Sequence, residues 1–222
     1  MIKKILKELF YNIKYRKINK LRSLFSGKES NWIISLDDCV KLDKIIKKYK
    51  IKNILELGTG VGSSTLSMAY SLPADGHIDT VEQFEKCIER AKQIIPPEYK
   101  KKIKFHHSDT EIFQPFKYIN TLAYKELPKG DWDLVVIDGP SFKMEGDYLV
   151  TSIPRGDLIK LMNVLKDGTF IYIDGSLITR KLLKRFYSHC VNHNRKEDLF
   201  QKISLCKSKD SKMEALKNYG FI

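Results

Sequence analysis

Short apolar runs alternate with helical stretches along most of this chain, and that alternation constrains the fold more than any other feature of the sequence. Apolar residues recur at helical spacing over residues 37–50, 63–72, 84–95, 155–165 and 178–192. Runs typical of strands lie between them, at residues 52–57, 78–81, 103–107, 133–137, 169–173 and 199–205. Strands separated by helices predict βαβ units, so we expect an α/β fold with a mostly parallel sheet covered on both faces.

The length and composition predict one folded domain preceded by an arm. The chain has 222 residues, of which 42% are hydrophobic. We expect an arm at 1–30 and the folded domain at 31–222. No apolar run approaches the length of a membrane span, and the N-terminus lacks the pattern of a secretory signal. The four cysteines are widely spaced without a CxxC pair, which predicts a reducing, cytoplasmic setting with neither a disulfide framework nor a structural zinc site.

A glycine-rich loop follows the first predicted strand. Gly58, Gly60 and Gly62 are spaced as GxGxG between a strand and a helix. Glycines permit a tight turn and let a ligand approach the backbone beside a helix N-terminus, which favours negative charge. The dinucleotide fingerprint GxGxxG would need its third glycine at position 63, which is Ser63, and the GK[ST] ending of a Walker loop is absent.

Acidic residues stand at the ends of the predicted strands. Glu82 ends the second strand, where a carboxylate can accept hydrogen bonds from both hydroxyls of a ribose, so the site favours an adenosyl ligand with a free ribose. Asp109, Asp138 and Asp174 follow the third, fourth and fifth strands. As alternatives, Glu82 is a solvated helix cap, and Ser108-Asp109 is the N-cap of a short helix.

These motifs, taken in order over residues 32–205, resemble the class I S-adenosylmethionine-dependent methyltransferase family. The residues that carry the resemblance are Glu56, Gly58, Gly60, Gly62, Glu82, Asp109 and Asp138. The runs at 136–139 and 170–174 are similar to the O-methyltransferase branches that act on small molecules and sugars. The resemblance implies a Rossmann-like, doubly wound, seven-stranded sheet. It also implies transfer of a methyl group from S-adenosylmethionine to a hydroxyl of a small molecule or glycan.

The resemblance also implies roles for these residues in binding the cofactor. The three loop glycines would line its methionine end, with Glu56 in the same motif. Glu82 would bind the ribose, Asp109 the adenine amino group, and Asp138 would lie beside the transferring methyl group. Two other functions stay open: an RNA methyltransferase, and a catalytically inactive protein that binds the cofactor as a sensor or scaffold.

Methyl transfer needs a base for the acceptor hydroxyl, and the loop after the fourth strand offers Asp138 and Lys143. This loop lacks the Pro-Pro-Tyr and Pro-Cys motifs, which argues against methylation of base amines or pyrimidine carbons. Arg155 and Asp157 lie in a region that often shapes the acceptor pocket in this family; an ordinary charge role at a helix start is the alternative.

Metal-dependent members of the family place one aspartate after the fourth strand and an acidic or amide pair after the fifth. Asp138 and Asp174 match that pattern, but Gly175 replaces the second member of the pair. Two oxygen ligands can hold Mg²⁺ if water completes the octahedron. The alternative is that Asp174 only caps a turn. His189 and His193 are spaced i,i+4 on a predicted helix, which we interpret as a solvated face.

The net charge of +13 is concentrated at the N-terminus. Residues 1–28 contain nine Lys or Arg and one Glu, a net charge of +8. Helical spacing puts one apolar stripe in this arm: Ile2, Ile5, Leu6, Leu9, Phe10 and Ile13. The arm is a packed cap, a peripheral contact with an anionic membrane at its inner face, or, with less support, a nucleic-acid contact. The sequence does not indicate an oligomeric state.

Overall fold

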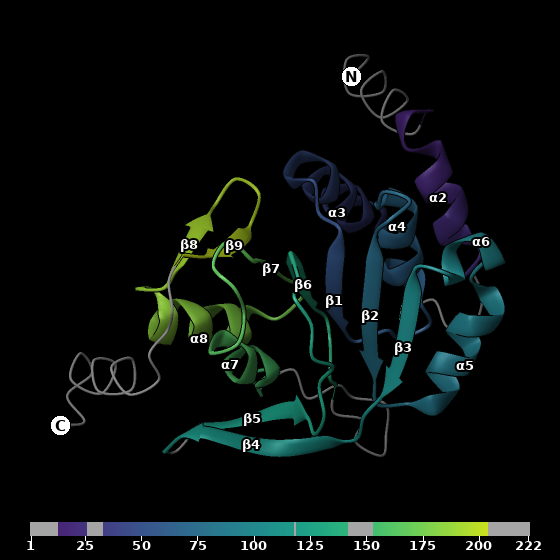
Figure 1. Ribbon diagram of the computed structural model, residues 1–222. Helices are drawn as coiled ribbons and strands as arrows, with labels where there is room; N and C mark the ends of the chain where they lie inside the picture. The colour runs from purple at the N-terminus through teal and green to yellow at the C-terminus, as the bar shows by residue number, and fades with distance from the viewer. Residues whose placement is uncertain (1–12, 26–32, 118, 142–152, 204–222) are drawn as a thin grey trace, which may run out of the picture. The chain divides into compact units, whose positions relative to one another are not determined.

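The computed structural model describes residues 13–25, 33–117, 119–141 and 153–203 (Figure 1). The chain divides into two compact units. Unit 1 comprises Met1–Lys52, Thr59–Ile78 and Phe84–Lys104, and unit 2 comprises Asn53–Gly58, Asp79–Gln83 and Phe105–Ile222. Unit 1 contains five of the described helices, and unit 2 contains most of the sheet.

The helices of unit 1 are α2 (Arg16–Ser23), α3 (Leu36–Tyr49), α4 (Ser63–Ser71), α5 (Glu85–Ile94) and α6 (Pro97–Lys100). The Ser35 hydroxyl caps α3 by accepting a hydrogen bond from the Asp38 N–H at 3.1 Å. The helix ends at Tyr49, and the next residue, Lys50, adopts the left-handed conformation typical of a helix C-terminus.

Part of the basic arm is a packed helix. α2 packs against α3 and α4, and its Ile18 is buried. Arg22 Nε donates a hydrogen bond to the Ile34 carbonyl at 2.6 Å. α2 begins at Arg16, where the predicted apolar stripe drifts. Of the stripe, only Ile13 lies within the described residues, and it is 64% exposed.

Seven strands form the sheet. In spatial order they are β3 (Ile103–His107), β2 (His77–Glu82), β1 (Asn53–Leu57), β6 (Leu134–Ile137), β7 (Phe170–Ile173), β9 (Leu199–Lys202) and β8 (Val191–Asn194). β6 pairs in parallel with β1 and β7, whereas β9 is antiparallel to both β7 and β8. The predicted α/β class and the seven-stranded sheet are confirmed, and each of the six predicted strands is present.

Unit 2 also contains a hairpin that the sequence patterns did not predict. β4 (Thr110–Phe116) and β5 (Ile119–Tyr124) form a separate antiparallel sheet. Because β4 begins at Thr110, Ser108-Asp109 does not cap a helix, and that alternative is wrong. Backbone hydrogen bonds tie β5 to the start of α7 (Asp157–Met162): the Leu122 N–H donates to the Pro154 carbonyl at 3.0 Å, and the Leu122 carbonyl accepts from the Gly156 N–H at 2.7 Å.

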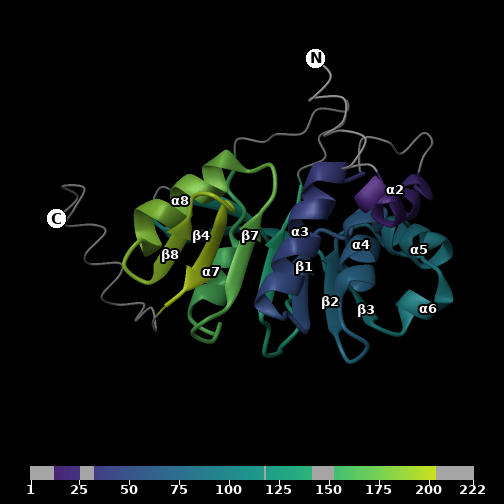
Figure 2. The ribbon, with the colours of Figure 1, turned by 90° about the horizontal axis from the view of Figure 1, so that it is seen from above.

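The core of unit 2 forms around β1, β6 and β7. Its fully buried members include Leu55, Leu57, Val135, Ile137, Ile171 and Ile173. α7 and α8 (Leu177–Tyr187) lie beside β7 and β8 in both views (Figures 1 and 2). Leu158 and Leu183 from these two helices join the same core. The apolar runs of the sequence therefore mark the centre of the sheet, as expected for strands buried on both faces.

The predicted helix over 178–192 is too long. α8 ends at Tyr187, and residues 191–194 form β8. His189 and His193 therefore do not share a helix face, and that interpretation is wrong. His193 instead stacks on Phe200 with ring centroids 4.2 Å apart, and its Nε2 lies 3.2 Å from Asp198 Oδ1.

Cys190 is disulfide-bonded, whereas Cys39 and Cys87 are free thiols. The sequence argued against a framework of several disulfides, and one bonded cysteine does not contradict that expectation. Among the described residues, no helix is both long and apolar enough to cross a membrane.

Candidate functional site

Three aligned strand ends place candidate residues of unit 2 along one edge of the sheet. The last residues of β1, β6 and β7 pair in register as Leu57↔Ile137↔Ile173. Gly58, Asp138 and Asp174 follow them directly. Because these strands are parallel, the three residues share the carboxyl edge of the sheet, which is where open α/β sheets bind ligands.

Two glycines let the backbones after β1 and β6 approach closely. Gly58 has a φ of +101°, and a Cβ there would lie 2.5 Å from the Gly139 nitrogen. A Cβ on Gly139 would lie 2.7 Å from Gly58 Cα and 2.9 Å from the Tyr124 hydroxyl oxygen. Gly58 N–H donates to the Val81 carbonyl at 2.9 Å, which ties this crossing to β2. No side chain fits at either glycine without displacing backbone.

The remainder of the glycine loop belongs to unit 1 and forms a tight turn. Gly60 and Gly62 have φ values of +51° and +92°, and Gly62 N–H donates to the Thr59 carbonyl at 2.9 Å. A Cβ on Gly62 would lie 2.8 Å from the Ala91 Cβ of α5. Both the left-handed conformation and the contact with α5 therefore require glycine at position 62.

The two glutamates on β1 and β2 have different environments. Glu56 is fully buried, and its Oε2 accepts a hydrogen bond from the Thr80 hydroxyl at 2.7 Å. It thus links β1 to β2 within the sheet. Glu82 ends β2 as predicted, and its Oε1 accepts a hydrogen bond from the Gln83 N–H at 2.8 Å. Of the two, Glu82 occupies the strand end expected of a ribose-binding carboxylate.

Asp109 follows β3, and a backbone hydrogen bond joins its neighbour Ser108 to Glu82 at the end of β2. The neighbouring Ser108 N–H donates to the Glu82 carbonyl at 3.1 Å. The Asp109 side chain is 68% exposed and pairs with Lys125 at 3.3 Å. An exposed pair of this kind contributes little to stability, so the Asp109 carboxylate stays available to a ligand.

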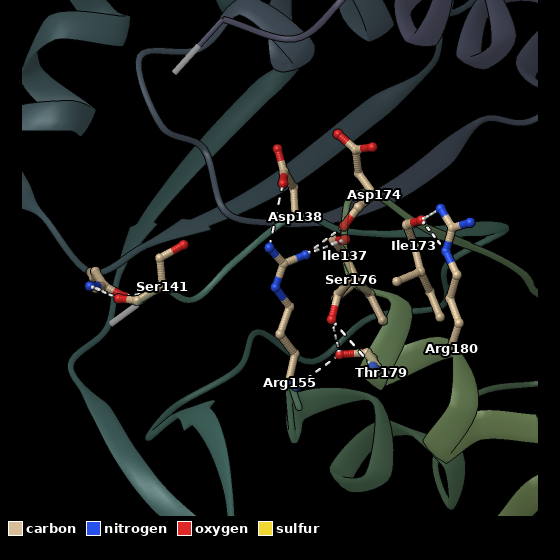
Figure 3. A network of polar contacts seen from close by, with 10 residues as sticks. Ile137, Asp138, Ser141, Arg155, Ile173, Asp174, Ser176, Thr179 and Arg180 are labelled. Carbon is tan, nitrogen blue, oxygen red and sulfur yellow. Dashed lines mark hydrogen bonds and ion pairs between the residues drawn. The ribbon is translucent and has the colours of Figure 1, made fainter. Parts of the chain in front are cut away.

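Arg155 joins the ends of β6 and β7 (Figure 3). Its Nη1 donates hydrogen bonds to the carbonyls of Ile137 at 3.0 Å and Asp174 at 2.9 Å. Its Nη2 lies 3.6 Å from Asp138 Oδ1. The Arg155 side chain is only 15% exposed, whereas that of Asp138 is 39% exposed. Burial lowers the pKa of Arg155, and the negative charges of Asp138 and Asp174 oppose that shift.

The same residues bear on the predicted Mg²⁺ site. Asp138 and Asp174 supply two carboxylates, and Gly175 offers no third side chain. Within residues 13–25, 33–117, 119–141 and 153–203, no group of three His, Cys, Asp or Glu side chains could hold a metal ion. Arg155 already places a positive charge beside Asp138. These residues do not fit a resident divalent cation.

Sequence reasoning missed Tyr124, whereas Asp157 was expected in the region of the acceptor pocket. In the described part of the chain, Tyr124 Oη and Asp157 Oδ2 are the buried side-chain atoms without a hydrogen-bond partner. Burial raises the pKa of Tyr124, and the charges of Glu82, Asp157 and Asp138 raise it further. Tyr124 thus lies close to the acidic groups at the strand ends, although it belongs to a hairpin that the apolar pattern did not predict.

A hydrogen bond from β5 fixes the Asp157 side chain. Its Oδ1 accepts a hydrogen bond from the Tyr124 N–H at 2.9 Å, and burial raises its pKa to about 7. Lys143, the other candidate base, lies outside the described residues. Unit 2 therefore brings together Glu82, Asp138 and Asp174 with the half-buried Arg155 and the buried Tyr124 and Asp157.

Comparison with known proteins agrees with this geometry. The chain is 25% identical over 146 residues to the tapetum-specific methyltransferase 1 of Arabidopsis thaliana. That match covers 65% of this chain and 60% of the relative, so the chain spans less than two thirds of its length.

Solved structures share the fold at low identity. The Streptomyces achromogenes O-methyltransferase TomG, crystallised in complex with S-adenosylmethionine, has a TM-score of 0.54 at 14% identity, over 84% of this chain and 89% of that one. A Staphylococcus aureus protein described as a putative caffeoyl-CoA O-methyltransferase has a TM-score of 0.52 at 17% identity, over 97% and 91%. The O-methyltransferase family model matches residues 14–210, which is most of the sequence. The chain belongs to the O-methyltransferase family.

Proposed function

We propose that this protein transfers the methyl group of S-adenosylmethionine to a hydroxyl group of a small molecule or glycan. The observation that carries the proposal is the carboxyl edge of unit 2, where bare backbone at Gly58 and Gly139 lies among the strand ends that carry Glu82 and Asp138. Membership of the O-methyltransferase family supports the same activity.

The cofactor would be held by groups that the site already presents. Glu82 would accept hydrogen bonds from the ribose hydroxyls, and the exposed Asp109 carboxylate would accept one from the adenine amino group. Gly58, Gly60 and Gly62 would let the methionine portion lie against backbone. The S-adenosylmethionine bound to TomG, which shares the fold, supports this choice of cofactor.

The reaction would be an in-line displacement at the methyl carbon. The bond between sulfur and methyl breaks as the bond between the acceptor oxygen and methyl forms, which leaves the thioether S-adenosylhomocysteine. The hydroxyl proton passes to a base, for which we propose Asp138, with Lys143 as the alternative. Holding the two reactants in line is itself a major part of the rate enhancement.

Transfer of labelled methyl from S-adenosylmethionine to a panel of phenols, hydroxy acids and sugars tests this function. We expect label in an ether product of at least one hydroxyl compound, and no label in products formed from amines or RNA. Glu82→Gln is the control, since it retains the shape of the side chain but should lose most cofactor binding. If the label appeared in RNA and in none of the hydroxyl compounds, the proposal would be overturned in favour of an RNA methyltransferase.

We also propose that residues 1–28 contact an anionic membrane surface. The support is the net charge of +8, with Lys14 and Lys20 exposed on the described part of the arm. Lys17 contributes less, because its Nζ lies 4.9 Å over the Tyr70 ring of unit 1. Each Lys or Arg near such a surface contributes about 1 kcal/mol, and salt screens the effect.

Liposome co-sedimentation with substituted lysines tests the membrane contact. Deleting residues 1–28 would remove the buried Ile18, so charge is removed instead by Lys3→Gln, Lys4→Gln and Lys7→Gln. Binding should need anionic lipid, weaken with salt and fall in this triple variant. Lys86→Gln, Lys100→Gln and Lys101→Gln form the matched control, which should bind as the unaltered protein does. Equal binding by the two triple variants would refute a role for the arm.

A further inference from the structure

Arg155 occupies the place between two strand ends where a cation is needed. The last carbonyl of β6, from Ile137, and the Asp174 carbonyl just after β7 both accept hydrogen bonds from its Nη1, at 3.0 and 2.9 Å. The Asp138 carboxylate lies 3.6 Å from its Nη2. Two carbonyl oxygens and a carboxylate form a set of oxygen atoms that either a divalent metal or a guanidinium can satisfy.

Hydrogen bonds at the backbone of Arg155 also help to fix the position of its guanidinium. The Arg155 N–H donates a hydrogen bond to Thr179 Oγ1 at 3.0 Å, and that oxygen lies 2.6 Å from the Ser176 hydroxyl at the start of α8. Arg155 also follows Pro154, whose carbonyl accepts a hydrogen bond from β5. The residue is therefore held at its backbone and at its tip, and Figure 3 shows its side chain extending from beside Thr179 toward Asp138.

A fixed guanidinium changes what Asp138 can bind. A charged arginine keeps its proton at all physiological pH values and presents several donors in one plane. Beside Asp138 it supplies the positive charge that a metal ion would otherwise bring and opposes the approach of a second cation. Gly175 removes the remaining side-chain ligand that the metal-dependent pattern requires.

We propose that Arg155 is the resident cation of this site, and that it positions Asp138 for methyl transfer without a divalent metal. The inference rests on the proposed methyltransferase function and adds a positioning residue to it. Arg155 does not touch the reacting atoms: it holds the ends of β6 and β7 together and orients the carboxylate that faces the acceptor.

Manganese binding gives a test that does not depend on knowing the acceptor. Mn²⁺ prefers the same oxygen ligands as Mg²⁺, and free Mn²⁺ is measured by electron paramagnetic resonance. The full-length protein, with or without S-adenosylhomocysteine, should leave the free Mn²⁺ signal unchanged. Stoichiometric loss of that signal, reversed by Asp138→Asn, would overturn the proposal.

Kinetics with the hydroxyl compound labelled in the panel assay give the second test. Turnover should be the same in EDTA and in added Mg²⁺. Arg155→Lys, which retains the charge but loses the planar fork, should lower kcat by about tenfold or more and leave the KM for S-adenosylmethionine nearly unchanged. If the role of Arg155 were purely structural, the substitution would lower the unfolding temperature without lowering kcat selectively relative to the KM for S-adenosylmethionine.

Arg180→Lys is the matched control, because Arg180 also bonds a carbonyl at the end of β7 but, within the part of the chain that the structure describes, none at the end of β6. Its Nε donates to the Ile173 carbonyl at 3.1 Å and its guanidinium pairs with Asp198, not with Asp138. We expect kcat to be unchanged in Arg180→Lys. Equal loss of kcat in the two arginine variants would refute a specific role for Arg155. Absence of S-adenosylmethionine binding would instead refute the proposed function, so the two failures are distinguishable.

Discussion

Replacing Gly58 with alanine tests the close approach of the strand ends on which the site depends. Gly58 has a φ of +101°, and its new Cβ would lie 2.5 Å from the Gly139 nitrogen, 2.8 Å from Gly139 Cα and 2.9 Å from the Asp138 carbonyl carbon. All three contacts are with backbone, which cannot rotate away as a flexible side chain can. The substitution therefore combines an unfavourable conformation with overpacking.

The size of the effect follows from these two costs. Left-handed backbone costs a residue with a Cβ about 1–2 kcal/mol, and overpacking adds about 1–3 kcal/mol, so Gly58→Ala should lower the free energy of unfolding by about 2–5 kcal/mol. Gly168 supplies the matched control: its φ is +91°, but nothing lies within 4 Å of its Cβ position. Gly168→Ala should therefore cost only the conformational part, about 1–2 kcal/mol.

Urea unfolding followed by circular dichroism measures both variants. Alanine restricts the unfolded chain equally at the two positions, so that contribution cancels in the comparison. Gly139→Ala, without a positive φ, isolates the contact, since its Cβ would lie 2.7 Å from Gly58 Cα. Equal destabilisation by Gly58→Ala and Gly168→Ala would refute the close approach of β1 and β6 beyond their paired residues.

Three further predictions concern individual side chains. Glu82→Gln should weaken S-adenosylmethionine binding by about 1.5–3 kcal/mol, or roughly 10–150-fold in Kd by calorimetry, because hydrogen bonds to a charged acceptor are lost; an unchanged Kd would exclude ribose binding by Glu82. Asp138→Asn should lower kcat by about 10²–10⁴-fold and Lys143→Gln should not, with the reverse result identifying Lys143 as the base. The pKa of Asp157 is raised by burial to about 7 in the folded protein, so the folded state binds a proton that the unfolded state has released. Its contribution to stability is present below pH 4 and is lost as pH rises to 7, on the order of 4 kcal/mol. Urea unfolding from pH 4 to 7 should show that loss in the unaltered protein and not in Asp157→Asn, and parallel pH profiles would contradict it.

The strands at the centre of the sheet were predictable because burial on both faces leaves a continuous apolar run. Residues 134–137 and 170–173 show that signal directly, and Asp138 could be placed because it follows such a run. Glu82 could be placed because it ends the mixed strand pattern of β2, in which Ile78 and Val81 flank two polar residues. The β4–β5 hairpin gave no comparable signal. β4 has mostly exposed or half-buried side chains and contains Pro115, so neither alternation nor an apolar run marks it.

The Arg155 network was not predictable for a different reason. Its partners are backbone carbonyls at positions 137 and 174, and a carbonyl has no sequence signature. Arg155 could be assigned to the region of the acceptor pocket, but not to Asp138. The end of α8 was misplaced because no glycine or proline follows Tyr187, so the helical pattern continues in the sequence after the helix has ended.

Calorimetric titration of the full-length protein with S-adenosylmethionine, S-adenosylhomocysteine and NAD tests the central claim most directly. We predict one site per chain for S-adenosylmethionine and for its demethylated product, weakened in Glu82→Gln and preserved in Arg180→Lys, with no binding of NAD. Tight binding of NAD, or no binding of S-adenosylmethionine by a folded protein, would contradict the account.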